Sequence, residues 1–187
     1  MLLYRVFPHL ATSSPGEPGH PLYVNPGQGY GRWDNPDLYH LAYMATTPEG
    51  AVGETFAHLS MWSKAMLAHP SIEGATRMLG AYSLDDKRLQ CLNFDDARTL
   101  LDRAIRPTEI VVRNRHRTQE IARNAFAENR WAGVAWWSMH WPSWALCALW
   151  AVDDLTVKDV TPLPGHRAMY DAGRILGKHV DVDNEIA

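Results

Sequence analysis

An arginine in a glycine-rich turn is the first group that could bind a ligand. Arg32 follows Gly29 and Gly31 and directly precedes Trp33. The planar guanidinium of arginine can grip phosphate oxygens in two places at once, and an indole offers a stacking face to a flat ring. Arg32 and Trp33 are therefore candidate binding residues. The alternative, a surface arginine beside a core tryptophan, is favoured by the spacing alone.

A tyrosine, a carboxylate and a histidine form the second group. Tyr43 lies in a short apolar run, and Glu54 and His58 follow it four residues apart, which makes them neighbours on one face of a helix. A carboxylate beside a cationic ribosyl centre stabilises an oxocarbenium-like transition state. Tyr43 could stack on the leaving group or hydrogen-bond to it. In the alternative, Glu54 is an exposed helical residue that pairs with His58.

A serine in a tryptophan-rich stretch is the third group. Ser138 follows the apolar run 133–137, and its hydroxyl could donate to a phosphate or an amide. No Gly-x-Ser-x-Gly pattern surrounds it, so a nucleophile elbow is not indicated and a structural serine is the usual case. The nearby tryptophans are Trp136, Trp137, Trp141, Trp144 and Trp150. Such a cluster is more typical of a core than of a ligand platform, although it could line a cleft.

Apolar periodicity predicts the elements that must position these groups. Strands are predicted over residues 2–7, 41–45, 78–83, 89–94, 131–137, 145–150 and 155–160, with a turn at 85–86. Helices are predicted from 48 to about 66, over 96–104 and 118–128, and once beyond 165. Thr47 and Asp95 suit the N-caps of the first two helices, and Pro48 suits a first helical position. Residues 8–29 are rich in Pro, Gly and Ser and predict a long loop.

The composition excludes several classes of protein. The chain has 187 residues, 46% of them hydrophobic and 21% charged, which fits one globular domain. The net charge is -3, so the basic surplus of a nucleic-acid groove is missing. The local basic cluster at 113–117 is interpreted as a solvated face, with a phosphate or acidic-partner contact as the alternative. Cys91 and Cys147 lack disulfide-scaffold or metal spacing.

The placement of the apolar residues predicts where the protein acts. The first ten residues contain no apolar stretch long enough for a signal peptide. No window reaches the roughly 18 to 20 apolar residues that a membrane span needs. We therefore expect a cytoplasmic protein with no membrane contact and no direct nucleic-acid partner.

The ordered motifs resemble the RES family, which is named for an Arg, a Glu and a Ser. The likeness rests on Gly31-Arg32-Trp33, Leu41-Ala42-Tyr43 and Ala51-x-x-Glu54-x-x-x-His58. A looser block follows, with Thr118-Gln119-x-Ile121-Ala122, Trp131-Ala132-Gly133-Val134 and Ser138, so the likeness covers roughly residues 4–150. The resemblance makes Arg32, Glu54 and Ser138 the family residues. It also matches Tyr43 to the family tyrosine and Trp33 to the aromatic position after the arginine.

The resemblance implies a fold and an activity. The fold is a single α+β domain over residues 1–187, with an ADP-ribosyltransferase-like split sheet and flanking helices, a core at about 4–160 and a tail at 161–187. The activity is that of an NAD-degrading toxin of a type II toxin–antitoxin system, which cleaves the nicotinamide–ribose bond by phosphorolysis. The products are nicotinamide and ADP-ribose 1''-phosphate. ADP-ribosyl transfer to a protein and NAD glycohydrolysis are alternatives, and a non-enzymatic tryptophan-rich binding module is an alternative of another class.

The resemblance also implies roles and partners. The catalytic set is Arg32, Tyr43, Glu54 and Ser138, and the NAD contacts are Arg32, Trp33, Tyr43, His58 and Ser138. NAD is the substrate and phosphate the co-substrate, with no prosthetic group and no metal. A helix-turn-helix antitoxin of the Xre type is the expected partner, and association of the chain into a homo-oligomer is possible.

The chain departs from the family pattern at two places. Asp34 stands where the family often has Asn, and Met139-His140 stands where a basic residue is common. The second departure leaves the acceptor of the reaction open. Arg5 is a reserve candidate for the phosphate contact.

Overall fold

The computed structural model describes residues 1–85, 90–150 and 152–182. Within these ranges, seven strands form one sheet: β1 (Leu2–His9), β2 (Ala42–Ala45), β4 (Thr76–Ser83), β5 (Cys91–Asn93), β6 (Gly133–Trp137), β7 (Ala145–Leu149) and β8 (Thr156–Pro162). Their order across the sheet is β5-β6-β7-β2-β1-β4-β8. Strands β5 and β6 are parallel and the other neighbours are antiparallel. The predicted strands are therefore confirmed, with ends that differ by a few residues.

The sheet is weakest between β1 and β2. Strand β1 pairs with β4 along its whole length, from Leu2 opposite Ser83 to His9 opposite Thr76. In the described ranges, by contrast, β1 meets β2 at the single pair Tyr4 and Ala45. The sheet thus consists of two halves that are joined by short pairing between β1 and β2. The expected α+β fold is confirmed, and this junction is where the sheet splits.

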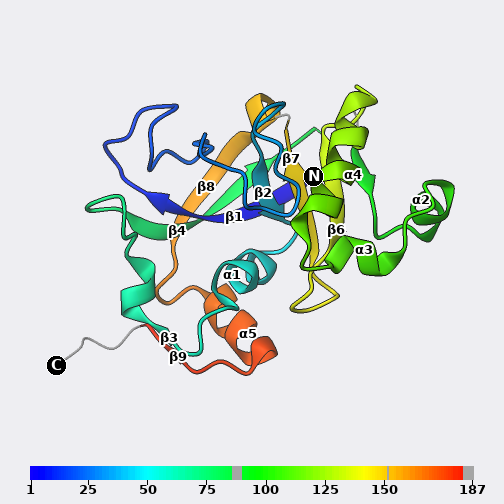
Figure 1. The fold of residues 1–187 in the computed structure, drawn as a ribbon. Coiled ribbons are helices and arrows are strands. Elements are labelled where there is room, and N and C mark those ends of the chain that lie inside the picture. The colour runs from blue at the N-terminus through cyan, green and yellow to red at the C-terminus, as the bar shows by residue number, and fades with distance from the viewer. Residues whose placement is uncertain (86–89, 151, 183–187) are drawn as a thin grey trace.

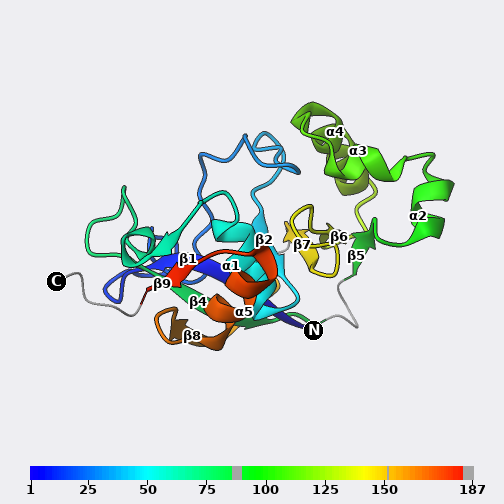
Figure 2. The ribbon, with the colours of Figure 1, turned by 90° about the horizontal axis from the view of Figure 1, so that it is seen from below.

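Five helices of the described chain flank the sheet (Figures 1 and 2): α1 (Pro48–Phe56), α2 (Ala97–Asp102), α3 (Pro107–Val111), α4 (Arg115–Ala127) and α5 (Arg167–Leu176). Helices α1 and α5 lie side by side, and α2, α3 and α4 gather at the β5–β6 end. The short strands β3 (Trp62–Ser63) and β9 (Val180–Asp181) pair in parallel. Two 3-10 turns cover Lys64–Leu67 and Val152–Asp154. Helix α5 packs against α1 and β9 pairs with β3, so residues 161–182 belong to the folded body. No helix in the described ranges combines the length and the apolar composition that a membrane crossing needs.

Helix α1 is shorter than the sequence predicts. It begins as expected, because the Thr47 side chain accepts a hydrogen bond from Gly50 N and Pro48 follows the cap. It ends at Phe56 instead of near 66 because Trp62 pairs with β9. The Trp62 backbone N donates to His179 O at 3.1 Å, and its indole N donates to Phe56 O at 3.0 Å. The prediction of one long helix is therefore wrong.

The other helix predictions are confirmed with local corrections. Asp96, not Asp95, caps α2, since its carboxylate accepts from the backbone N of Arg98 and Thr99. Helix α4 begins three residues earlier than predicted, behind an Asn114 cap. Helix α3 was not predicted. The turn predicted at 85–86 and the start of the strand predicted at 89 fall partly outside the described residues.

Two apolar clusters cover the two faces of the sheet. Side chains alternate between faces along a strand, and β2 sends Tyr43 and Ala45 to one cluster and Ala42 and Met44 to the other. The first cluster receives the helices, and the second is covered partly by the long loop between β1 and β2, through Leu22 and Val24. That loop confirms the irregular segment predicted from composition. It also brings residues 29–34 to the split in the sheet.

Candidate functional site

Two adjoining cavities extend from the junction of the half-sheets toward the end of β6. The first, of about 280 Å³, lies between β1 and β2 and has Arg5 and Thr55 in its wall. The second, of about 360 Å³, is lined by Arg32, Arg115 and His140 among others. The two cavities share three lining residues, namely Tyr43, Glu54 and Trp136. Pockets of about 300 to 1,000 Å³ hold small ligands and cofactors, so the pair has room for a dinucleotide.

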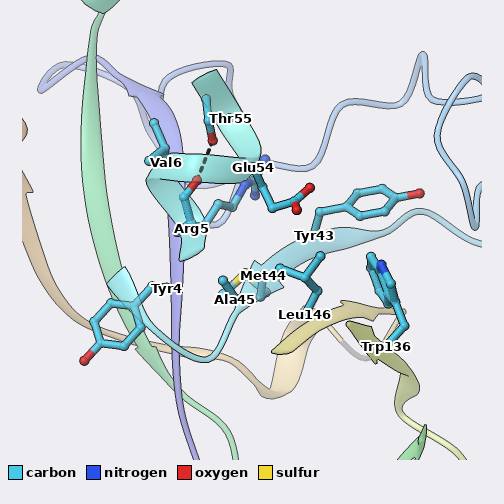
Figure 3. A pocket seen from close by; sticks show the side chains of 11 residues that line it. Tyr4, Arg5, Val6, Tyr43, Met44, Ala45, Glu54, Thr55, Trp136 and Leu146 are labelled. Carbon is cyan, nitrogen blue, oxygen red and sulfur yellow. Dashed lines mark hydrogen bonds between the residues drawn. The ribbon is translucent and has the colours of Figure 1, made fainter. Parts of the chain in front are cut away.

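Glu54 stands at the junction of the two cavities. It projects from the last turn of α1, and its carboxylate points toward the Tyr43 ring (Figure 3). Its Oε1 accepts a hydrogen bond from the Ser138 hydroxyl. Ser138 is fully buried, and its Oγ accepts from the backbone N of His140 at 2.9 Å and of Trp141 at 3.1 Å. The Ser138 proton is thus directed at Glu54, and Ser138 orients the carboxylate instead of facing a ligand.

Tyr43 forms the wall opposite Glu54. Its hydroxyl donates to Asp34 Oδ1 at 2.6 Å and accepts from the backbone N of Trp33 at 3.0 Å. Burial raises the pKa of Tyr43, and the negative charge of Asp34 raises it further, so the phenol stays protonated. The ring stands nearly perpendicular to that of Trp136, at 87° and 6.3 Å between centroids. The two rings give the cavity junction an aromatic lining.

Arg32 lines the second cavity with only part of its guanidinium free. Its Nη1 donates to Ile110 O at 2.7 Å and to Val112 O at 2.8 Å, at the end of α3. These two bonds use both protons of Nη1, and the residue is only 8% exposed. Burial lowers the pKa of Arg32 most, the charge of Arg115 lowers it further, and Glu54 raises it. Arg32 is therefore both a structural tie and a cation beside the cavity.

Three residues expected to contact NAD do not line these cavities in the described structure: Ser138, which bonds Glu54, and Trp33 and His58. Trp33 is fully buried and stacks on Phe94 at 5.5 Å and 11°. It belongs to the core, which is the alternative that its spacing favoured. His58 follows the end of α1 and is exposed. Because the helix stops at Phe56, the pairing of Glu54 with His58 along one helix face is not formed.

Three lining residues carry more weight than the sequence suggested. The sequence favours a core role for Trp136 and leaves a cleft-lining role open. Although Trp136 is only 6% exposed, it lines both cavities. Arg115 was placed on a solvated face, and it lines the second cavity as an exposed cation. Arg5 was the reserve candidate. It lines the first cavity, donates to Tyr23 O at 3.1 Å, and has its pKa lowered by burial.

The tryptophans do not form an open platform. Those that are buried are Trp33, Trp62, Trp136 and Trp144. Trp141 is 42% exposed, and the rest are partly buried. Within the described ranges, no three His, Cys, Asp or Glu side chains gather as a metal site would need. Where the two cavities meet, the site thus has one carboxylate, Glu54, and two aromatic rings, Tyr43 and Trp136, and arginines line both cavities.

The RES domain model matches residues 2–171. The chain belongs to the RES family. A solved structure with the same fold is a chain of the M. tuberculosis MbcT–MbcA toxin–antitoxin complex, with a TM-score of 0.63 and 14% identity over 95% of this chain and 89% of that chain. No curated protein matches the chain. The RES match extends beyond the residues 4–150 that carry the resemblance and reaches into helix α5.

Proposed function

We propose that this RES protein is a toxin that consumes NAD by breaking its nicotinamide–ribose bond. One observation carries the proposal: Glu54 lies at the junction of two cavities, with its carboxylate held by Ser138. Tyr43 and Trp136 flank it with aromatic surface. This arrangement puts a fixed negative charge beside the proposed position of a flat, cationic ring and its sugar.

The proposed chemistry follows from the charge that develops during cleavage. When the carbon–nitrogen bond breaks, its electron pair leaves with nicotinamide, and the ribose carbon gains positive charge. A preorganised carboxylate stabilises such a centre electrostatically. An oxygen of inorganic phosphate then bonds to that carbon and gives ADP-ribose 1''-phosphate. Phosphorolysis is the proposed reaction.

The remaining residues supply binding. The Nη1 of Arg32 is used by the two carbonyl groups, and one proton of Nη2 points to Met139 Sδ at 3.8 Å. Nε and the other proton of Nη2 are left for a ligand, and Arg115 adds a second cation in the same cavity. We assign the pyrophosphate to this pair, since a guanidinium binds phosphate oxygens well. The nicotinamide would lie against the Tyr43 ring. Trp136 would provide the second stacking face, a role that the sequence suggests for Trp33. Ser138 does not bind the substrate in this proposal but holds the Glu54 carboxylate in position.

Membership of the RES family and the fold shared with a chain of a toxin–antitoxin complex support the biological role. We propose that a cognate antitoxin, with a helix-turn-helix region of the Xre type, binds this chain and blocks the cavity. The proposed place of action is the cytoplasmic NAD pool. Expression without the antitoxin should lower cellular NAD and stop growth. Normal growth with normal NAD would contradict this role.

Product identification tests the reaction. The purified chain is incubated with NAD, with and without inorganic phosphate, and the products are identified by mass spectrometry. The expected result is nicotinamide and ADP-ribose 1''-phosphate, formed only when phosphate is present. Free ADP-ribose without phosphate would favour hydrolysis, and ADP-ribose attached to a protein would favour transfer. Intact NAD in all samples would refute the proposal and favour a binding module.

A further inference from the structure

Both carboxylate oxygens of Asp34 accept hydrogen bonds. The residue is 5% exposed, and its Oδ2 accepts from the backbone N of Gly29 at 2.9 Å and of Gly31 at 2.7 Å. Its Oδ1 accepts from the Tyr43 hydroxyl at 2.6 Å. A carboxylate in its ionised form only accepts hydrogen bonds. This set of partners therefore suits a charged Asp34.

The same contacts fix the direction of the Tyr43 proton. A phenol has one proton to donate. The backbone N–H of Trp33 donates to the Tyr43 oxygen, so the phenol proton must point to Asp34. Tyr43 therefore has no proton left for a ligand. It offers the cavity its ring and one lone pair.

The conformation of the loop at residues 29–34 depends on the contact between Asp34 and Tyr43. A Cβ built on Gly31 would collide with the Asp34 carboxylate and the Tyr43 hydroxyl. Gln119 also holds the loop, because its Nε2 donates to Gly31 O at 3.0 Å. The approach of Asp34 to Tyr43 thus depends on a glycine at this position and on a tie to helix α4.

We propose that Asp34 is a positioning residue that makes Tyr43 an electron-rich ring for a cationic ligand and withholds its hydroxyl as a donor. The inference rests on the proposed function and adds a property of its substrate. A positive charge is attracted to the face of an aromatic ring, and a nearby buried carboxylate strengthens that attraction. The site should therefore prefer the oxidised dinucleotide, whose nicotinamide is a cation, over the neutral reduced form.

An asparagine at position 34 would reverse this arrangement without changing its size. The two glycine N–H groups need an acceptor, so the amide oxygen would take the place of Oδ2. The amide NH₂ would then face Tyr43 and donate to it. Tyr43 would accept from two N–H groups and turn its own proton into the cavity. Asp34→Asn therefore removes the charge and frees the hydroxyl in one step.

Binding measurements with two forms of one ligand test the inference. The probe is a carbocyclic NAD analogue, in which a methylene replaces the ribose ring oxygen so that the bond survives. Its oxidised and reduced forms are titrated by calorimetry into the native protein, Asp34→Asn and Asp37→Asn. Asp37 is the matched control, because it is exposed, pairs with Arg123 at 3.0 Å and lies outside the lining of both cavities. Melting temperatures are recorded for each.

The native protein should bind the oxidised form about tenfold more tightly, and Asp34→Asn should reduce that ratio to about twofold, as expected for one screened charge nearby. Asp37→Asn should keep the native ratio. A folded Asp34→Asn protein that also keeps the native ratio would overturn the inference and leave the proposed function standing. A native protein that binds neither form would overturn both.

Tyr43→Phe provides a second test that does not depend on Asp34→Asn folding. It keeps the ring and the Asp34 charge and removes only the hydroxyl. Both forms should then lose about threefold in affinity through looser positioning of the ring, with the ratio retained because the Asp34 charge stays in place. The melting temperature should fall, since the lost bond is a charge-assisted one to the buried Asp34. A loss of about 30-fold or more for both forms in a variant that is still folded would show that the hydroxyl donates to the ligand and would overturn the inference.

Discussion

The two walls of the second cavity are built in different ways. The loop wall, residues 29–34, is tied to the rest of the protein by many polar contacts, including those of Arg32 to Ile110 and Val112. The framework wall consists of Tyr43, Glu54 and Trp136, which project from β2, α1 and β6. Its carboxylate carries one described hydrogen bond, from Ser138. Changes in the loop wall should therefore affect stability and binding together, and changes at Glu54 in the framework wall should affect chemistry alone.

The sharpest contrast should come from Glu54→Gln in the framework wall. We expect NAD turnover to fall by about 100-fold or more, as is typical when one electrostatic group is removed from a transition state. The melting temperature should stay nearly constant, because glutamine can still accept from Ser138. Initial rates of nicotinamide release and thermal melts on the same samples measure both.

Glu49→Gln is the matched control for this change. Glu49 lies in the first turn of the same helix and outside the lining described for both cavities. Its neutralisation should alter turnover by less than about twofold and cost only the small contribution of an acidic residue at a helix start. Near-normal turnover in a folded Glu54→Gln protein would remove Glu54 from the mechanism.

Arg32→Lys should damage both properties, as a change in the loop wall must. A lysine cannot reproduce the fork that holds Ile110 O and Val112 O, so the melting temperature should fall by about 4–8 °C, the equivalent of roughly 2 kcal/mol in a chain of this size. NAD affinity should fall by roughly 10- to 100-fold through the lost charge-assisted bonds. Calorimetry and melts separate the two effects. An affinity loss at constant stability would mean that the contacts to α3 contribute nothing.

Ser138→Ala should give a smaller, indirect effect. The change leaves Glu54 in place without its donor and deprives the backbone N of His140 and Trp141 of an acceptor. We expect kcat to fall by about 3- to 10-fold with little change in KM, the scale of one lost hydrogen bond. Steady-state kinetics measure the split. A rise in KM at constant kcat would instead place Ser138 against the substrate.

The smallest effect should come from His58→Ala. His58 is exposed beyond the end of α1. Its removal should change turnover by less than about twofold and stability by less than about 0.5 kcal/mol, as is usual for surface substitutions. A tenfold loss of turnover would show that the segment after α1 moves into the cavity when NAD binds.

The framework wall was largely predictable from sequence, because local patterns determine it. The cap at Thr47 fixes the start of α1, and the apolar stripe of Val52 and Phe56 fixes which face is buried. Glu54 then falls on the open face beside Tyr43. The end of α1 was not predictable, since it depends on the pairing of Trp62 with a strand far along the chain.

The roles of the loop residues could not be predicted, because their partners are distant. The carbonyl groups that Arg32 holds lie 78 and 80 residues further along the chain. Trp33 and Trp136 are both indoles whose side chains are buried, and only the fold decides that the first is enclosed and the second borders the cavities. Arg115 looked like part of a solvated cluster because nothing local marks the cavity behind it.

The most direct measurement is a crystal structure of the Glu54→Gln protein with NAD bound. The central claim is that the dinucleotide spans the two cavities that meet at residue 54. The account predicts the nicotinamide ring between Tyr43 and Trp136, the ribose carbon beside the substituted side chain at position 54, and the pyrophosphate against Arg32 and Arg115. Density for NAD at any other surface, with these cavities empty, would contradict it.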